Sequence, residues 1–221
     1  RTIVRQQEIN VTTGLTTNAI DPVVCSGVDP KIRALWGRVD DKGDWFAKDF
    51  ADENNHSVVV RVDFGAASML ITGDLEETVE PPNRAGIERL LESYVGTNLL
   101  DADVYLAGHH GSHNGTTPEL LARVSPKIAV VSAGPPCART GHTAYAYGHP
   151  RELTVQELEA AVSLSRAQPI PVTTFSGPKT PVLRTVTKAV YATSWDGNVV
   201  LRARTNGAWE LLSTSGAPSC D

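Results

Sequence analysis

The sequence has few cysteines and no long apolar run. Its three cysteines, Cys25, Cys137 and Cys220, are widely spaced and form no Cys-x-x-Cys pair, which argues against a cysteine-based zinc site. They leave open whether one disulfide forms or all three remain thiols. No apolar stretch approaches the roughly 20 residues that cross a bilayer, and the N-terminal residues lack the apolar core of a signal peptide. We therefore predict no transmembrane segment in this chain.

The sequence also lacks an excess of basic residues. Its 25 acidic and 20 basic side chains give a formal net charge of -5. This balance argues against binding of nucleic acid by overall electrostatics, although a local basic patch remains compatible with it. The 221 residues are 41% apolar and 20% charged, near the average for soluble globular chains, which argues against disorder and a fibrous structure. The length allows one large domain or two small ones.

Three regions differ in their patterns of residues. Residues 1–53 combine turn-forming residues with short apolar pieces, which indicates irregular structure with one or two short strands. Residues 54–165 alternate strands with helices, which predicts an α/β layer. The strands are expected at 58–64 and 68–72 (a hairpin), 103–107 and 127–132, and the helices near 87–94, 117–124 and 154–164.

The tail, residues 166–221, is expected to be a loop and a β-rich segment packed on the same domain. Its Pro, Thr and Gly content predicts a loop over 166–187. Short strands are expected at 189–193, 199–203 and 209–212, separated by Asp196-Gly197 and Asn206-Gly207. Both dipeptides are typical of tight hairpin turns.

Polar residues with metal-binding chemistry recur near the ends of predicted strands. Asp74 follows the strand at 68–72, His109 and His110 follow the strand at 103–107, and His149 lies beyond the strand at 127–132. In open α/β sheets this edge is where sites form. Imidazoles with a carboxylate are ligands that zinc and manganese accept, so the pattern predicts a hydrolytic metal site.

Each residue also has a purely structural interpretation. Gly73-Asp74 is compatible with a simple turn, and His149-Pro150 with a rigid one. The pair His109-His110 is harder to explain by packing, because burying two imidazoles requires two sets of hydrogen-bond partners. From the residues alone, His56, His113 and His142 are interpreted as loop histidines.

Several motifs together resemble the metallo-hydrolase domain of bacterial DNA-internalisation (competence) proteins. They are Asn54-Asn55-His56-Ser57, Thr72-Gly73-Asp74, Gly108-His109-His110-Gly111-Ser112, Val130-Val131-Ser132 and Tyr147-Gly148-His149-Pro150. The resemblance covers roughly residues 54–160. It implies an α/β fold of the metallo-β-lactamase type, an αββα sandwich represented here mainly by its C-terminal half, with a C-terminal β-hairpin tail.

The same resemblance implies a reaction and a set of roles. Asp74 is expected to be catalytic and to bridge two ions of Zn²⁺ or Mn²⁺, one of which His109 or His110 would bind. His149, also catalytic, would line the site or stabilise a leaving group, and Ser112 with His113 would lie near the substrate. The implied reaction is hydrolysis of phosphodiesters in single-stranded DNA by a metal-activated water. An extracytoplasmic location is slightly favoured on the same ground.

One departure from the family is large. Its main metal motif, His-x-His-x-Asp-His, should precede Asn54 and occurs nowhere in this chain. Because the first residue is not Met, we expect that an N-terminal half or a second chain supplies these ligands, or that this lineage has lost catalysis. Two alternatives therefore stand beside the hydrolase of phosphodiesters: a non-catalytic binding or interaction module on the same scaffold, and a hydrolase of lactones or thioesters.

Overall fold

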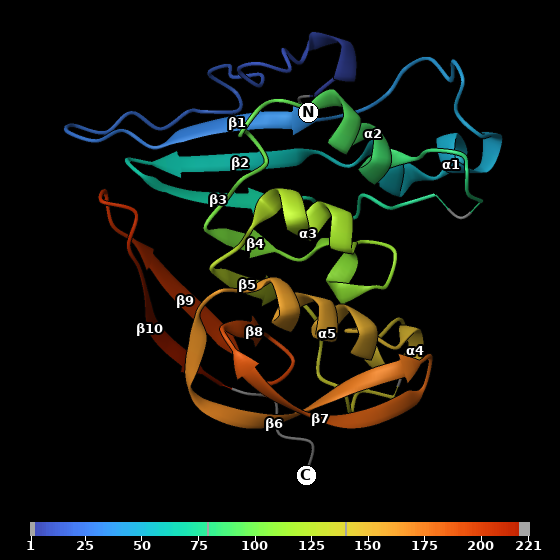
Figure 1. Ribbon diagram of the computed structural model, residues 1–221, viewed down its shortest axis with the longest axis vertical. Coiled ribbons are helices and arrows are strands. Elements are labelled where there is room, and N and C mark those ends of the chain that lie inside the picture. The colour runs from blue at the N-terminus through green and yellow to red at the C-terminus, as the bar shows by residue number, and fades with distance from the viewer. Residues whose placement is uncertain (1–2, 79, 140, 217–221) are drawn as a thin grey trace.

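The largest element of the fold is a six-stranded mixed sheet with strand order β1-β2-β3-β4-β5-β8. The computed structural model describes residues 3–78, 80–139 and 141–216. The strands of the sheet are β1 (Lys31–Trp36), β2 (Val59–Phe64), β3 (Ala67–Ile71), β4 (Val104–Leu106), β5 (Ile128–Val131) and β8 (Val190–Ala192). In Figure 1 the helices α2, α3 and α5 lie across one face of this sheet. The prediction of an α/β layer is confirmed.

The helices follow the apolar spacing of the sequence. They are α1 (Ala47–Ala51), α2 (Gly86–Ser93), α3 (Pro118–Val124), α4 (Ala144–Tyr147) and α5 (Glu152–Ala161), with short 3-10 turns η1 (Gln6–Glu8), η2 (Glu53–His56) and η3 (Gly108–Gly111). At the start of α3 the hydroxyl of Thr117 accepts a hydrogen bond from the backbone N–H of Leu120, at 3.2 Å, and Pro118 occupies the first turn. The helix predicted at 154–164 begins and ends earlier, as α5.

Strand direction changes across the sheet and thereby brings the predicted site residues together. β2 pairs antiparallel with β1 and β3, whereas β3, β4, β5 and β8 run parallel. Parallel pairing needs crossover connections, which contain α2 between β3 and β4 and α3 between β4 and β5. Because parallel strands end at one edge of the sheet, the segments after β3 and β4 meet there. The backbone N–H of His109 donates to the carbonyl of Gly73 at 3.0 Å.

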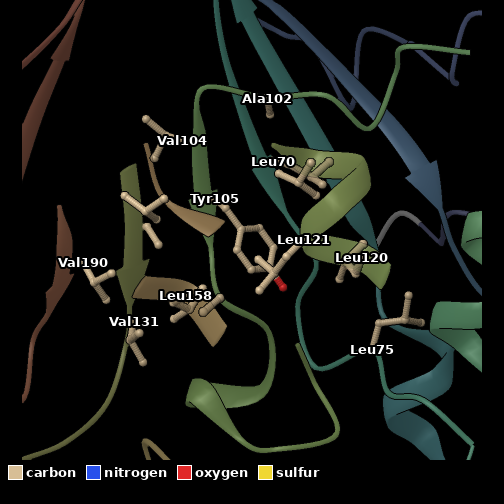
Figure 2. Packing of buried hydrophobic residues seen from close by; sticks show 14 of the residues in the cluster. Leu70, Leu75, Ala102, Val104, Tyr105, Leu120, Leu121, Val131, Leu158 and Val190 are labelled. Atoms are coloured by element: carbon tan, nitrogen blue, oxygen red, sulfur yellow. The ribbon is translucent and has the colours of Figure 1, made fainter. Parts of the chain in front are cut away.

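The core lies between the sheet and the helices. Leu70, Tyr105, Ala129 and Val190 are in register across four strands, so their side chains share one face, and all four are fully buried. Figure 2 shows Tyr105 packed among Leu120, Leu121 and Leu158 of the covering helices. The hydroxyl of Tyr105 accepts from the backbone N–H of Gly108 at 3.2 Å, so the core also supports the loop after β4.

The prediction of a loop over residues 166–187 is wrong. This segment forms a long hairpin of β6 (Ser165–Gly177) and β7 (Thr180–Lys188). The prolines of β6 misled the prediction, because proline removes a ladder donor and usually marks a loop. In a two-stranded hairpin one side of each strand has no partner strand, so β6 accommodates Pro169 and Pro171 at an edge. Val172, Thr174 and Phe175 of the same strand are buried.

The second C-terminal hairpin is formed by β9 (Asn198–Ala203) and β10 (Trp209–Ser215), which confirms the turn at Asn206-Gly207 and the predicted β-hairpin tail. The prediction of a hairpin at Asp196-Gly197 is wrong, because β8 pairs with β5 in the main sheet and not with β9. Asp196 is instead a buried residue that holds the turn after β8 in place. It forms an ion pair with Arg166 and accepts the backbone N–H of Ala192 at 3.0 Å.

The N-terminal segment contributes the 3-10 turn η1, the edge strand β1 and the short helix α1, which are joined by irregular structure. Leu15 forms an isolated antiparallel bridge with Ala34, and Gln6 donates its backbone N–H to the carbonyl of Arg38 at 2.8 Å. Within the described part of the chain, no helix has the length and apolarity of a membrane span. Cys25 is an exposed free thiol, and Cys220 lies outside the described residues.

Glu77, in the segment after β3, lies among the carboxylates of Glu88, Glu119 and Glu157. Burial, and then repulsion from these groups, raises the pKa of Glu77 to about 7. The unfolded chain has the ordinary value of about 4.3. The cost of ionising Glu77 in the fold therefore grows from about pH 4 to about pH 7 and stays constant above that range. This acid destabilises the fold at neutral and alkaline pH.

We expect Glu77→Gln to raise the free energy of unfolding by about 1 kcal/mol near pH 8 and to have little effect near pH 4. The figure is discounted because the side chain is still partly in contact with water. Urea denaturation at the two pH values measures it. Glu8→Gln, an exposed glutamate in η1, is the matched control and should change neither value. An equal gain at both pH values would contradict the assignment.

Candidate functional site

Asp74 is held at the carboxyl edge of the sheet by its backbone. β3 ends at Ile71, and Gly73 then takes a φ of 60°, in the left-handed region that favours glycine. The backbone N–H of Asp74 donates to Oγ of Ser57 at 3.1 Å. Its half-buried carboxylate has no hydrogen-bond or ion-pair partner among the described residues. The chain thus fixes the position of this residue and leaves its carboxylate available to a ligand.

His109 and His110 lie in a strained turn directly after β4. Both have positive φ, 46° and 55°, within η3. Left-handed conformations at non-glycine residues cost about 1–3 kcal/mol each and persist where the surroundings impose them. The surroundings here are close: a Cβ at Gly108 would lie 2.3 Å from the carbonyl oxygen of Gly115, and one at Gly115 would lie 2.6 Å from Cβ of His109. Only glycine fits at these two positions, so the turn is tightly determined.

The two imidazoles are each oriented through Nδ1. Nδ1 of His109 lies 2.6 Å from Oε1 of the buried Glu76, which also accepts a hydrogen bond from the side-chain amide of Asn54 at 2.9 Å. Nδ1 of His110 lies 2.7 Å from the carbonyl oxygen of Ser132 and donates to it. Both rings therefore keep Nε2 free of these contacts. Histidines that bind metals show the same arrangement, with the second nitrogen donating to a carboxylate or carbonyl.

The pair of Glu76 and His109 shifts the proton affinity of both groups. Hydrogen bonding to Glu76, opposed by burial, raises the pKa of His109. For Glu76 burial acts to raise the pKa, but the contacts with His109 and Asn54 outweigh it and the pKa is lowered. Each charge therefore favours the other, which stabilises the orientation of the His109 ring.

His149 reaches the same edge from another segment. It follows α4, its ring centroid lies 5.7 Å from that of His109, and it stacks on Tyr147 at 6.1 Å. Burial, and then the charges of His109 and Arg151, lowers the pKa of His149 to about 4. The ring is therefore neutral at neutral pH. His110 and His149 both line a cleft of about 460 Å³.

Ser112 and His113, like Asp74 and His109, are not among the residues that line this cleft. Ser112 is buried, and its hydroxyl donates to the side-chain carbonyl of Asn114 at 2.6 Å and accepts the backbone N–H of Gly115 at 3.1 Å, so it holds the turn together. His113 is exposed and lines a different cavity. The roles of Ser112 and His113 in binding a substrate remain predictions.

The two other histidines differ from each other. His56 is not a loop histidine: it ends η2, stacks on Trp45 and uses both ring nitrogens in contacts with Val39 and Phe50. His142 precedes α4, stacks on Tyr147 and lines the cleft.

Comparison with known proteins connects this edge to a family. Residues 29–134 match the metallo-beta-lactamase superfamily, a range that contains Asp74, His109 and His110. This match covers 106 of the 221 residues, just under half of the chain. The chain is 37% identical over 109 residues to "Competence protein ComA" of Neisseria gonorrhoeae, which is 49% of this chain and 13% of that protein. It is 32% identical over 113 residues to "ComE operon protein 3" of Bacillus subtilis, 51% of this chain and 12% of that protein.

The resemblance to competence proteins is therefore confirmed, over a limited length. A third relative, "Recombination protein 2" of Haemophilus influenzae, is 38% identical over 82 residues, 37% of this chain and 9% of that protein. The chain thus spans only about an eighth of the length of the curated relatives it matches, or less. No solved structure matches it significantly.

Members of the metallo-beta-lactamase superfamily often use zinc, and the side chains at this edge fit a metal ion in part. The chemistry of the donors fits, because Asp74, His109 and His110 offer a free carboxylate and two oriented imidazoles at one edge. The geometry is incomplete. Among residues 3–78, 80–139 and 141–216, no three His, Cys, Asp or Glu side chains are grouped closely enough to hold an ion. Together with the absent His-x-His-x-Asp-His motif, this describes part of a ligand set.

The residues that orient the ring of His109 were not predicted from the sequence. Glu76 follows Asp74 by two positions, but its pairing with His109 depends on the parallel alignment of β3 and β4, which the local sequence does not reveal. Asn54 lies still further away along the chain. An acidic residue close behind a predicted strand-end ligand is the one signal that could have suggested Glu76.

Proposed function

We propose that this chain is one part of a metal-dependent hydrolase of phosphodiesters and that it supplies one side of the metal site. The observation that carries the proposal is the orientation of His109 and His110. Nδ1 of His109 makes an ion-pair contact with Glu76, and Nδ1 of His110 donates to the carbonyl of Ser132. These contacts leave Nε2 of each ring uncommitted at the sheet edge that also carries Asp74. A strained turn with two imidazoles arranged in this way has no evident use in packing.

In the complete protein, Asp74 with His109 or His110 would contact the metals. A bound Zn²⁺ or Mn²⁺ pair supplies an activated water and neutralises charge on phosphate oxygens. The other residues act around it. Glu76 and Asn54 hold the ring of His109, and the carbonyl of Ser132 holds that of His110. The neutral ring of His149 contributes a hydrogen-bonding nitrogen next to His109 and no charge at neutral pH.

The rest of the ligand set must then come from an N-terminal half of a longer protein or from a second chain. The curated relatives are roughly four times as long as this chain, and two of them have names that refer to competence or to recombination. Single-stranded DNA is therefore the substrate we propose. An extracytoplasmic location belongs to the same proposal.

The test compares substrates with the complete natural protein loaded with Zn²⁺ or Mn²⁺. We expect cleavage of single-stranded DNA, and no turnover of lactones or thioesters above the rate of a His110→Ala variant. His142→Ala, which changes a histidine of the same cleft that is not proposed as a ligand, is the control and should retain most of the activity. Turnover of a lactone or thioester in place of DNA would contradict the proposal.

One observation favours a second candidate, a non-catalytic binding or interaction module. The described side chains contain no group of three that could hold a metal. This candidate predicts that Asp74→Ala and His110→Ala leave the biological activity intact. The same two variants therefore separate it from the hydrolase.

A further inference from the structure

A cavity next to the proposed hydrolytic site is lined by cationic and polar side chains. It has a volume of about 400 Å³, and its lining includes His113, Arg151, Gln156 and Ser176. Arg151 follows the His149-Pro150 pair of the first cleft, and His113 follows the strained turn of His109 and His110. The charge of Arg151 lowers the pKa of His149, so this cavity and the hydrolytic site lie within electrostatic reach of each other.

Arg151 is fixed in place by three segments of the fold. Its backbone N–H donates to the carbonyl of Gly111 at 2.8 Å, which ties it to the turn of His109 and His110. It forms a parallel bridge with Phe175 of β6, whose backbone N–H donates to the carbonyl of Pro150 at 3.1 Å. It also stands immediately before α5. Gly111, 40 positions before Arg151, and Phe175, 24 positions after it, thus both contact this arginine.

The charge of Arg151 is not neutralised within the described structure. Its guanidinium has no hydrogen-bond or ion-pair partner there, and its Nε is enclosed by the protein. Other partly buried arginines differ: Arg166 pairs with Asp196 and Arg184 with Glu159. Glu152 lines the same cavity but forms no ion pair with Arg151. A partly buried cation without a counter-ion favours an anionic ligand, because an arginine fork matches phosphate geometry.

His113 adds a hydrogen-bonding group to the cavity. Burial, and then the charge of Arg151, lowers the pKa of its imidazole, so the ring is neutral at neutral pH and still carries one N–H donor. The first turn of α5, a helix of 10 residues, places backbone N–H groups and a partial positive charge on the same side. These features are compatible with a ligand that accepts hydrogen bonds and carries negative charge.

We infer that Arg151 and His113 form a binding site for a phosphate group of a nucleic acid strand, adjacent to the hydrolytic site. The inference rests on the proposed function, since it assigns to this chain a contact with a phosphate that flanks the bond to be cleaved. It explains how a chain with a net charge of -5 can contact a polyanion. A local phosphate site provides the contact with the nucleic acid backbone that a basic surface would otherwise provide.

The test is an NMR titration of the 221-residue chain in the presence of a chelator. The probes are inorganic phosphate and a short single-stranded oligonucleotide, with and without a 5′-phosphate. We expect saturable shifts of the Arg151 Nε–H signal and of the backbone amides around His113 and Gln156. Arg151→Gln should weaken oligonucleotide binding about tenfold and reduce its salt dependence by about one phosphate contact. Arg151→Lys should weaken it less, because it keeps the charge but loses the planar fork.

The matched control is Arg202→Gln, which removes an arginine of β9 that is half exposed. Equal weakening by Arg151→Gln and Arg202→Gln would show that only net charge matters and would overturn the inference. Binding of inorganic phosphate without binding of the oligonucleotide would also overturn it. If Arg151→Gln does not fold, the oligonucleotide binding of Arg151→Lys and of His113→Ala is compared with that of Arg202→Gln in its place. Because no metal is present, loss of phosphate binding here is distinguishable from failure of the proposed hydrolysis.

Discussion

Asp74→Asn in the complete natural protein is expected to reduce metal-dependent turnover by about 10³-fold or more. The amide is nearly isosteric with the carboxylate but carries no charge, so it would be a much weaker ligand for a cation. A loss of about 4 kcal/mol of transition-state stabilisation corresponds to three orders of magnitude in rate. The fold should not suffer. The carboxylate has no hydrogen-bond partner in the described structure, so its replacement breaks no internal contact.

The control for this variant is Asp101→Asn. Asp101 is exposed and precedes β4, so it lies at the opposite edge of the sheet from Asp74. Rates with saturating metal, together with urea denaturation of both variants without metal, separate catalysis from stability. We expect both variants to unfold within about 0.5 kcal/mol of the natural protein. A loss of stability by Asp74→Asn of several times this size, without metal, would show that Asp74 is a structural residue.

Arg166→Met is expected to have the largest effect on stability. The side chains of Arg166 and Asp196 are only 8% and 4% exposed, and Nη1 of Arg166 also donates to the carbonyl of Val190 at 2.8 Å. Removing the arginine leaves a buried carboxylate without its counter-ion, which costs about 3–5 kcal/mol. Urea denaturation at neutral pH measures this loss.

The same variant should loosen the site, because the ion pair fixes the turn after β8. In that turn the hydroxyl of Thr193 donates to the carbonyl of Ala133 at 2.7 Å and accepts its backbone N–H at 2.9 Å. Ala133 follows Ser132, whose carbonyl orients His110. Weaker metal binding should therefore accompany the loss of stability.

The double variant Arg166→Met with Asp196→Leu distinguishes the ion pair from simple packing. When both charges are replaced by apolar groups of similar size, no unpaired charge remains, so we expect most of the lost stability to return. A double variant as unstable as the sum of its two single variants would contradict the role assigned to the pair.

Local patterns in the sequence predicted the elements that place the site. The β-branched run of β2, the turn at Gly65 and the apolar run of β3 gave a hairpin, and Thr117-Pro118 marked the start of α3. Asp74, His109 and His110 were then expected at one edge, and the backbone contact between His109 and Gly73 joins the two segments there. Short-range signals suffice for these features because each depends on residues close in sequence.

Long-range pairing explains what the sequence did not reveal. β8 was expected to pair with β9 through Asp196-Gly197, yet Asp196 is tied to Arg166, 30 residues away, and β8 completes the main sheet. The tertiary contact overrides the turn preference of the dipeptide. The orientation of His109 by Glu76 and the unpaired charge of Arg151 are also consequences of distant segments meeting, so they are visible only in the folded chain.

We propose that Asp74 and the two imidazoles form one side of a metal site that other ligands complete. The decisive measurement is the metal content of the purified complete protein, compared with that of the 221-residue chain under identical loading. We predict about two ions of Zn²⁺ or Mn²⁺ per complete protein, lost in a variant with Asp74→Asn and His110→Ala together, and much weaker binding to the 221-residue chain. A complete protein that holds no metal, or that keeps its metal in that double variant, would show that these residues do not form part of a metal site.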